Sequence, residues 1–161
     1  MESVMLKPTD AGMILAMNNA AVPNVNEATE AELAALIEMS ELTVALKDGD
    51  TVLGFVLTLP PGVDYASENY RFFSERYDRF IYVDRIVVGE EARNRGIGVK
   101  LYDIVSEYAK EHDAPRVLCE VNLEPPNPGS LRFHKRIGFV EVGQQRTKGG
   151  TYLVSLLAKE L

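Results

Sequence analysis

A glycine-rich turn between a buried strand and an amphipathic helix constrains the fold of this chain more than any other feature. Residues Phe80 to Val88 are apolar with few exceptions, which predicts a strand covered on both faces. From Ile97 to Tyr108 apolar residues recur with helical spacing. The segment that joins them, Arg93 to Val99, reads Arg-Asn-Arg-Gly-Ile-Gly-Val. Such a turn aims backbone N–H groups and the positive end of the helix dipole at one point, so it predicts an anion site.

The spacing of the glycines narrows the choice of anion. Gly96 and Gly98 carry no side chain that would block close approach, and Arg93 and Arg95 add charged donors suited to phosphate oxygens. A dinucleotide fingerprint would need a third glycine where Leu101 stands, and a Walker loop would need Gly-Lys-Ser/Thr after a wider gap. The turn alone therefore indicates a di- or polyphosphate ligand, with a nucleotide or an ordinary tight turn as alternatives.

A second motif is a helix that Asn127 and Pro128 are suited to begin and Gly138 to end. Together the two motifs resemble those of the GNAT N-acetyltransferase superfamily. Its signature is a strand ending in Val, then Arg/Gln-x-x-Gly-x-Gly/Ala opening a helix, and later an Asn-x-x-Ala/Ser helix ending in Gly-Phe. The matching residues are Val88, Arg93, Gly96 and Gly98 in the first motif and Asn127, Ser130, Phe133, Gly138 and Phe139 in the second. The resemblance is close from Phe80 to about Val142.

The resemblance implies an α/β (α+β) fold in a single domain, residues 1–161. This fold has a mixed, mostly antiparallel sheet with flanking helices and a splayed central strand pair. It also implies that acetyl-CoA lies in the splay, with its pyrophosphate on the loop amides and its pantetheine on the strand backbone. The coenzyme-binding residues that follow are Ile86, Val87, Val88, Arg93, Asn94, Arg95, Gly96, Ile97, Gly98, Val99, Asn127, Ser130 and Phe133. The expected reaction is direct transfer of an acetyl group to a primary amine of a small metabolite or a peptide N-terminus.

Transfer from a thioester to an amine needs a base for the ammonium and gains from an acid for the thiolate. Glu120 is the first candidate for the base, because it is the charged residue in the apolar strand from Val117 to Val121. Some family members that act on ribosomal protein N-termini carry a glutamate at this point. Asp84, in the strand before the glycine turn, is the rival, and either carboxylate could instead form only a salt bridge. The Val88 N–H is the candidate donor to the tetrahedral oxyanion.

For the acid, the resemblance places a tyrosine four residues before the Gly-Phe pair, where this chain has His134. A histidine can protonate a thiolate near neutral pH, or it can only bond the sulfur. The acceptor pocket is expected to form from the segments Asn18 to Asn26, Pro60 to Asp78 and Gly143 to Gly150. Tyr82, Asn19 and Tyr65 are the candidate residues for it. The polar and aromatic segment from Pro60 to Asp78 is expected to cover the site, and it is also a candidate contact in a homodimer.

Composition argues against several classes of function. The net charge of −7, from 24 acidic and 17 basic side chains, disfavours nucleic acid or an anionic membrane as partner. One cysteine and two histidines weaken any metal site. No run approaches the length of a membrane span and the start lacks the pattern of a leader, so we expect a cytoplasmic protein without a metal. The alternative to an enzyme is a module that senses acyl-CoA without turnover.

The remaining elements are predicted from periodicity and turn residues. They are a strand from Val4 to Pro8, a helix capped by Asp10, a helix opened by a Thr29/Glu32 capping box, a hairpin of Leu42–Leu46 with Val52–Leu59, a strand from Arg116 to Asn122, and a closing hairpin of Val140–Val142 with Tyr152–Leu157.

Overall fold

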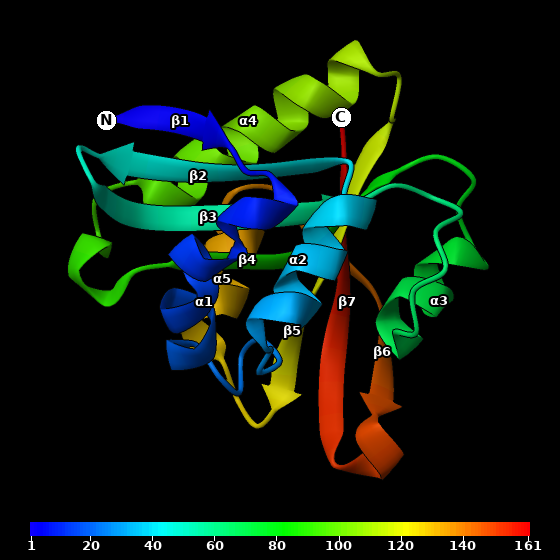
Figure 1. Ribbon diagram of the computed structural model, residues 1–161. Coiled ribbons are helices and arrows are strands. Elements are labelled where there is room, and N and C mark those ends of the chain that lie inside the picture. Colours follow the sequence, from blue (N-terminus) through cyan, green and yellow to red (C-terminus); the bar gives the residue numbers. More distant parts are fainter.

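The computed structural model describes residues 1–161 and has one seven-stranded sheet with helices on both faces (Figure 1). The strands are β1 (Glu2–Met5), β2 (Leu42–Asp48), β3 (Thr51–Leu59), β4 (Ile81–Val88), β5 (Arg116–Glu124), β6 (Val140–Thr147) and β7 (Tyr152–Glu160). The helices are α1 (Ala11–Ala20), α2 (Glu30–Met39), α3 (Glu68–Ser74), α4 (Ile97–Glu111) and α5 (Pro128–Arg136). The strand order is β1-β2-β3-β4-β5-β7-β6, and only the β4–β5 pair is parallel. The predicted mixed, mostly antiparallel sheet is confirmed.

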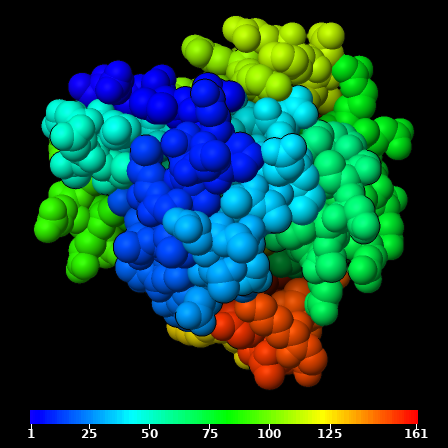
Figure 2. All heavy atoms as spheres, viewed as in Figure 1, coloured from blue at the N-terminus to red at the C-terminus, as the bar shows by residue number.

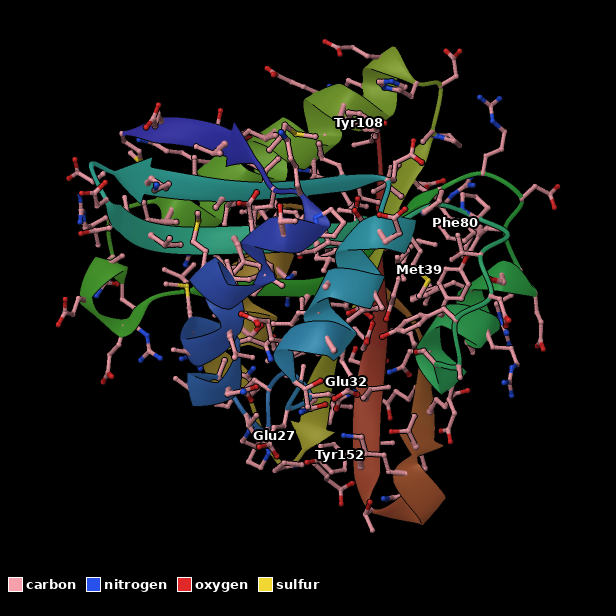
Figure 3. All side chains as sticks on the ribbon, viewed as in Figure 1. Glu27, Glu32, Met39, Phe80, Tyr108 and Tyr152 are labelled. Atoms are coloured by element: carbon pink, nitrogen blue, oxygen red, sulfur yellow. The ribbon has the colours of Figure 1, made fainter.

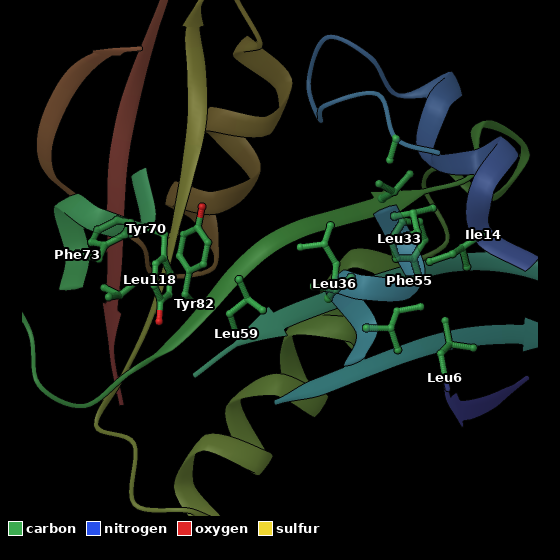
Figure 4. Packing of buried hydrophobic residues seen from close by; sticks show 14 of the residues in the cluster. Leu6, Ile14, Leu33, Leu36, Phe55, Leu59, Tyr70, Phe73, Tyr82 and Leu118 are labelled. Atoms are coloured by element: carbon green, nitrogen blue, oxygen red, sulfur yellow. The ribbon is translucent and has the colours of Figure 1, made fainter. Parts of the chain in front are cut away.

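The two faces of the sheet carry separate apolar cores, because successive side chains of a strand point to opposite faces. On one face α1, α2 and α3 cover the strands, and Ile14, Leu33 and Phe55 belong to this first core (Figure 4). On the other face α4 and α5 pack, and Leu101 and Val117 belong to the second core. The position of a residue along β4 or β5 therefore decides which helices its side chain meets.

β4 and β5 pair only where they begin. Ile81 lies opposite Val117 and Tyr82 opposite Leu118, and no further pair follows. Beyond this point the two strands separate, as Figure 1 shows in the middle of the sheet. The splayed central pair is confirmed, and one edge of each strand is left without a partner strand there.

A β-bulge in β4 lies where the splay begins. Leu57 of β3 is opposite Arg85 and Thr58 is opposite Val83, so Asp84 is an extra residue in β4. A bulge bends its strand and increases the local twist. It also changes the alternation of side chains, so Asp84 and Arg85 do not follow the simple alternation that the sequence indicates for this strand.

The sequence signals for the start of α2 and for the turn between β2 and β3 were correct. The Glu32 N–H donates to Thr29 Oγ1 (3.1 Å) and the Thr29 N–H donates to Glu32 Oε1 (3.0 Å), which is the predicted capping box. The tight turn between β2 and β3 has Gly49 at a φ of 60°, as its Asp-Gly sequence predicts. Asp10 is the N-cap residue of α1, as predicted, but its carboxylate makes no capping hydrogen bond to the helix. The carboxylate instead accepts the Lys7 N–H (2.8 Å), closing a short 3₁₀ turn before the helix.

Strand boundaries were less predictable at the edges of the sheet. β1 begins and ends earlier than expected, because Pro8 starts the 3₁₀ turn. β6 continues through its glutamines to Thr147, and β7 continues to Glu160. An edge strand can be polar because only its pairing partner holds it in place. No helix of the structure is both long enough and apolar enough to cross a bilayer.

Candidate active site

The glycine loop begins α4 as predicted. Gly96 is the N-cap residue and has a left-handed φ of 73°, and Asn94 before it has a φ of 64°. A Cβ at Gly96 would have no atom within 4 Å, so the backbone angle requires glycine here and the space in front is open. The N–H groups of the first helical residues, Ile97 to Val99, have no partner inside the helix. They are the anion-binding groups that the sequence predicts.

The remaining loop residues differ in their roles. A Cβ on Gly98 would lie 2.9 Å from the tip of the Phe133 ring of α5, so this glycine lets the two motifs pack together. Arg93 lines the cavity described below. Arg95 does not, and its exposed guanidinium lies 3.9 Å from Asp48. Of the two predicted arginines, the structure brings only Arg93 to the site.

The free edge of β4 presents backbone donors to the splay. The Gly89 N–H donates to the carbonyl of Leu53 in β3 (2.8 Å). In an antiparallel pair the N–H groups of successive residues point to alternate sides of the strand. Those of Val88 and Ile86 therefore point away from β3, towards the gap beside β5. An extended ligand in the gap would find these donors unpaired.

A cavity of about 760 Å³ extends through the splay. One side is lined by the glycine loop, α4 and α5. The other side is lined by the α1–α2 loop (residues 21–29), α3 with the segment before it, and the turn between β6 and β7. The separated parts of β4 and β5 lie between these two sides. A ligand that enters beside α4 can therefore meet a second ligand that enters beside α1 and α3.

Glu120 lies in β5 where the splay begins, on the side of α3. The Tyr82 hydroxyl, 2.8 Å from both carboxylate oxygens, donates to them, and Asn69 Nδ2 of α3 donates at 3.2 Å. Burial raises the pKa of Glu120 to about 8, the negative charge of Asp84 adds to the rise, and the Tyr82 hydrogen bond opposes it. A carboxyl group that titrates near neutral pH is suited to take up and release a proton.

Asp84 is held in a different environment. The Tyr65 hydroxyl donates to its Oδ1 (2.6 Å), and Arg85 Nε donates to its Oδ2 (2.8 Å). The side chains of this ion pair are both only 5% exposed. Arg85 thus neutralises Asp84, whereas no cationic side chain pairs with Glu120.

The Arg85 guanidinium also fixes the α1–α2 loop. Its Nη1 donates to Asn18 Oδ1 of α1 (2.9 Å). The neighbouring Asn19 uses its side-chain amide on both backbone groups of Ala28, at 3.0 Å each. The structure therefore places Asn19 inside the loop scaffold and not in the cavity, because the loop needs these hydrogen bonds to hold its shape.

His134 is buried and both of its ring nitrogens are engaged. Nδ1 lies 2.7 Å from the Ser130 carbonyl oxygen, which can only accept, so Nδ1 carries the hydrogen. Nε2 then accepts the Tyr102 hydroxyl at 2.7 Å. Burial lowers the pKa of His134, and the bond to Ser130 opposes this only in part. Both ring nitrogens are used in these hydrogen bonds, so neither is free to bond a sulfur in the cavity.

Tyr102 links His134 to β5. It lies in α4, lines the cavity, and is close enough to Cys119 that the thiol contributes to the raised pKa of its hydroxyl, after burial as the main cause. The Cys119 thiol itself is buried, and burial raises its pKa. An acyl carrier would need a thiolate, so Cys119 belongs to the core.

Most of the predicted residues meet in this one cavity. Those that line it are Ile86, Val87, Val88, Arg93, Asn94, Gly96, Ile97, Gly98, Val99, Asn127, Ser130, Phe133, Glu120, Asp84, His134 and Tyr65. Arg95 and Asn19 lie outside the lining, and Tyr82 is fully buried beneath Glu120. Asn127 occupies the N-cap position of α5 without using its side chain as a cap, which leaves the amide free.

Tyr102, Asn69 and Lys148 are among the lining residues that the sequence did not single out. Asn69 lies in the segment that was expected to cover the site, but nothing singled it out. Lys148 was part of a predicted hairpin turn. Tyr102 follows Leu101 in a helix whose pattern is satisfied without it. Their partners are distant in sequence, so no local pattern could have identified them.

No group of three or more His, Cys, Asp and Glu side chains comes together as a metal site would require.

The splayed strand pair, the loop at the start of α4 and the cavity between them define an acyltransferase-like fold. Residues 15–139 match the model of the acetyltransferase (GNAT) family, and the chain belongs to this family. No curated protein matches the chain by sequence.

Solved structures share the fold at low sequence identity. Ard1 from Thermoplasma volcanium has a TM-score of 0.80 at 16% identity, over 99% of this chain and 97% of that one. NAA60 of Arabidopsis thaliana, in complex with a bisubstrate analogue, has a TM-score of 0.75 at 19% identity, over 99% and 97%. The putative acetyltransferase yncA from Salmonella typhimurium, with acetyl-CoA, has a TM-score of 0.74 at 16% identity, over 100% and 94%.

Proposed function

We propose that this chain transfers the acetyl group of acetyl-CoA directly to a primary amine of a small metabolite or a peptide N-terminus. The observation that carries the proposal is a single cavity with anion-binding amides on one side of the sheet and the Glu120 carboxyl on the other. Membership of the GNAT acetyltransferase family supports acetyl-CoA as the donor. The Salmonella protein of the same fold was solved with acetyl-CoA.

The coenzyme side of the cavity fits this donor. The free amides from Ile97 to Val99 and the Arg93 guanidinium supply donors for a pyrophosphate. The N–H groups of Ile86 and Val88 would pair with the amide carbonyls of an extended pantetheine. The thioester would then reach the beginning of the splay, where Glu120 lies.

Glu120 is the proposed base. Asp84 is held by Arg85 as an ion pair, and withdrawing its charge would leave a buried guanidinium without a partner. An alkyl ammonium titrates near 10, so a carboxylate with a pKa of about 8 accepts its proton more readily than an ordinary glutamate would. The freed amine attacks the thioester carbonyl, and the C–N bond forms.

The oxyanion that forms is better placed for Ile86 than for Val88. The β4–β5 register puts Glu120 level with Asp84. At about 3.3 Å per residue, Val88 lies roughly 13 Å further along β4 and Ile86 only about 7 Å. We therefore assign the oxyanion hydrogen bond to the Ile86 N–H, which revises the expectation for Val88.

His134 and Tyr102 act together on the leaving group in this proposal. A thiol titrates near 8.5, so a thiolate leaves without full protonation and needs a hydrogen bond more than a proton. Because the ring of His134 has no free N–H, we assign it to hold the Tyr102 oxygen beside β5 on the coenzyme side. Tyr102 has one hydroxyl hydrogen, which must turn from His134 Nε2 to the sulfur as the thiolate forms. When the C–S bond breaks, its electron pair stays on sulfur, and the newly attached nitrogen loses its second proton to solvent. Solvent also protonates the thiolate after release.

The test is thiol release from acetyl-CoA with a panel of primary amines. Release that depends on an amine, together with the acetylated product by mass spectrometry, is the expected result. Tight binding of acetyl-CoA without release for any amine would support the sensor alternative. Stabilisation by ATP or NAD but not by coenzyme A would overturn both, because the glycine loop would then serve a nucleotide.

A further inference from the structure

We call the side of the cavity lined by the α1–α2 loop, α3 and the β6–β7 turn the acceptor side. Only some of the charged side chains on this side form ion pairs. Four charged side chains line it there: Asp84 and Arg85, which pair, and Glu120 and Lys148, which form no ion pair. The other polar side chains on this side are uncharged: Asn24, Asn26, Tyr65, Ser67, Asn69, Asn122, Thr147 and Tyr152. With Glu120 assigned to the reacting amine, Lys148 is the one charged group left to recognise the rest of the acceptor.

Lys148 is held in position over the cavity. Its Nζ donates to Asn26 Oδ1 (2.5 Å) and lies 4.1 Å from the centre of the Tyr152 ring. The contact joins the β6–β7 turn to the α1–α2 loop, and both segments meet at the lower edge of the molecule in Figure 2. Figure 3 labels one residue from each segment, Tyr152 of β7 and Glu27 of the α1–α2 loop. An ammonium has three N–H donors, so Lys148 keeps two for a ligand.

The sheet register sets the separation between the two groups. Glu120 lies opposite Leu156 of β7, and the Lys148 turn follows the pair of Thr147 with Tyr152. Four residues of β7 span roughly 13 Å. The turn that carries Lys148 and the position of Glu120 thus lie about 13 Å apart along β7, so an acceptor that meets both side chains needs its amine and its anionic group to be several bonds apart.

We propose that the acceptor is a primary amine with an anionic group several bonds away, and that Lys148 binds this anion. The inference rests on the proposed function, since it assigns the amine to Glu120. Charge attraction and two hydrogen bonds from Lys148 would hold the anion, and the amine would reach the thioester at the beginning of the splay. A dication would place a second positive charge beside Lys148, so such acceptors are disfavoured.

Three acceptors of equal chain length test the inference: 5-aminopentanoate, pentylamine and 1,5-diaminopentane. Wild-type kcat/KM is expected to fall in that order. Lys148→Met should lower kcat/KM for 5-aminopentanoate about tenfold, which corresponds to about 1.4 kcal/mol, and change that for pentylamine less than about twofold. Lys148→Glu should raise kcat/KM for 1,5-diaminopentane relative to that for the other two acceptors. Lys110→Met removes the same charge from an exposed position at the end of α4 and should leave the order unchanged.

The outcomes separate the two proposals. Thiol release with all three amines but without this order, or an equal effect of Lys148→Met on all three, would overturn the role of Lys148 and leave the enzymatic proposal intact. A rise in the KM for acetyl-CoA common to all acceptors would place Lys148 at the coenzyme instead. No release with any amine would overturn both. Thermal melting of each variant controls for folding.

Discussion

At the scale of single residues, the partner of a carboxylate decides its chemistry here. Glu120 and Asp84 lie two residues beyond the last β4–β5 pair, on adjacent strands, and line the same cavity. Arg85 holds Asp84 as an ion pair, whereas Glu120 accepts only neutral hydrogen bonds and its pKa rises to about 8, mainly through burial. The two candidates that the sequence left open are therefore unequal for a physical reason.

Glu120→Gln should remove one step of the pH profile. In the wild type we expect kcat/KM to rise through about pH 8, as Glu120 ionises, and then again towards the pKa of the amine near 10. The variant should keep only the second rise, with a rate at pH 8.5 lower by about 10²-fold. An unchanged rise through pH 8 in the variant would refute Glu120 as the base.

His134→Phe should lower kcat about 10- to 100-fold, because the Tyr102 hydroxyl loses the partner that holds its oxygen beside β5. The Kd of coenzyme A should change little. Tyr102→Phe should cause a similar loss, and the double variant no more than either alone. If His134 were instead a proton donor, wild-type activity would fall above its lowered pKa. A pH profile between 5 and 8 and the double-mutant cycle distinguish these roles.

At the scale of elements, close contact between α4 and the strands below it positions the glycine loop. Gly54 of β3 makes this contact possible: a Cβ there would lie 2.8 Å from the carbonyl oxygen of Val87 and 3.0 Å from Cγ2 of Ile97. The first neighbour is backbone and cannot move aside like a side chain. The helix N-terminus thus depends on a glycine outside the loop itself.

Gly54→Ala should destabilise the protein by about 1–3 kcal/mol, because the added methyl group overpacks the contact. For a domain of this size each kcal/mol lowers Tm by about 2–4 °C. Gly129→Ala is the matched control, since the nearest atom to its Cβ, Arg132 Nη2, lies 4.0 Å away. Melting curves of the two variants measure the difference, and equal values would contradict the close packing of α4.

At the scale of the whole molecule, the net charge and the charge of the site have opposite implications. The chain carries −7 overall, which by itself is compatible with a cationic acceptor. The acceptor side of the cavity instead adds an unpaired Lys148 to the compensated Asp84–Arg85 pair. Recognition at short range depends on the groups that face the ligand, whereas net charge governs only long-range attraction.

The raised pKa of Glu120 should also make the stability of the whole protein depend on pH. Its folded pKa of about 8 lies above the ordinary value of 4.5, so between these pH values the folded state binds more protons than the unfolded state and stability falls as pH rises. The Glu120→Gln variant has no carboxyl group to titrate here, so it does not lose this part of its stability as pH rises. The Tm of the variant minus that of the wild type should therefore increase from pH 5 to pH 8 by several degrees. A difference independent of pH would show that the pKa is not raised.

The sequence by itself determined the strand, glycine loop and helix order, the capping box at Thr29, and the lining from Ile86 to Phe133, because these depend on local backbone geometry and spacing. The tertiary structure alone decided which carboxylate is unpaired, that His134 is engaged by Tyr102, and that Lys148 and Glu120 line one cavity. Those properties arise from neighbours that are distant in the chain. Burial and partner charge, which set a pKa, exist only once the splayed sheet has brought these residues together.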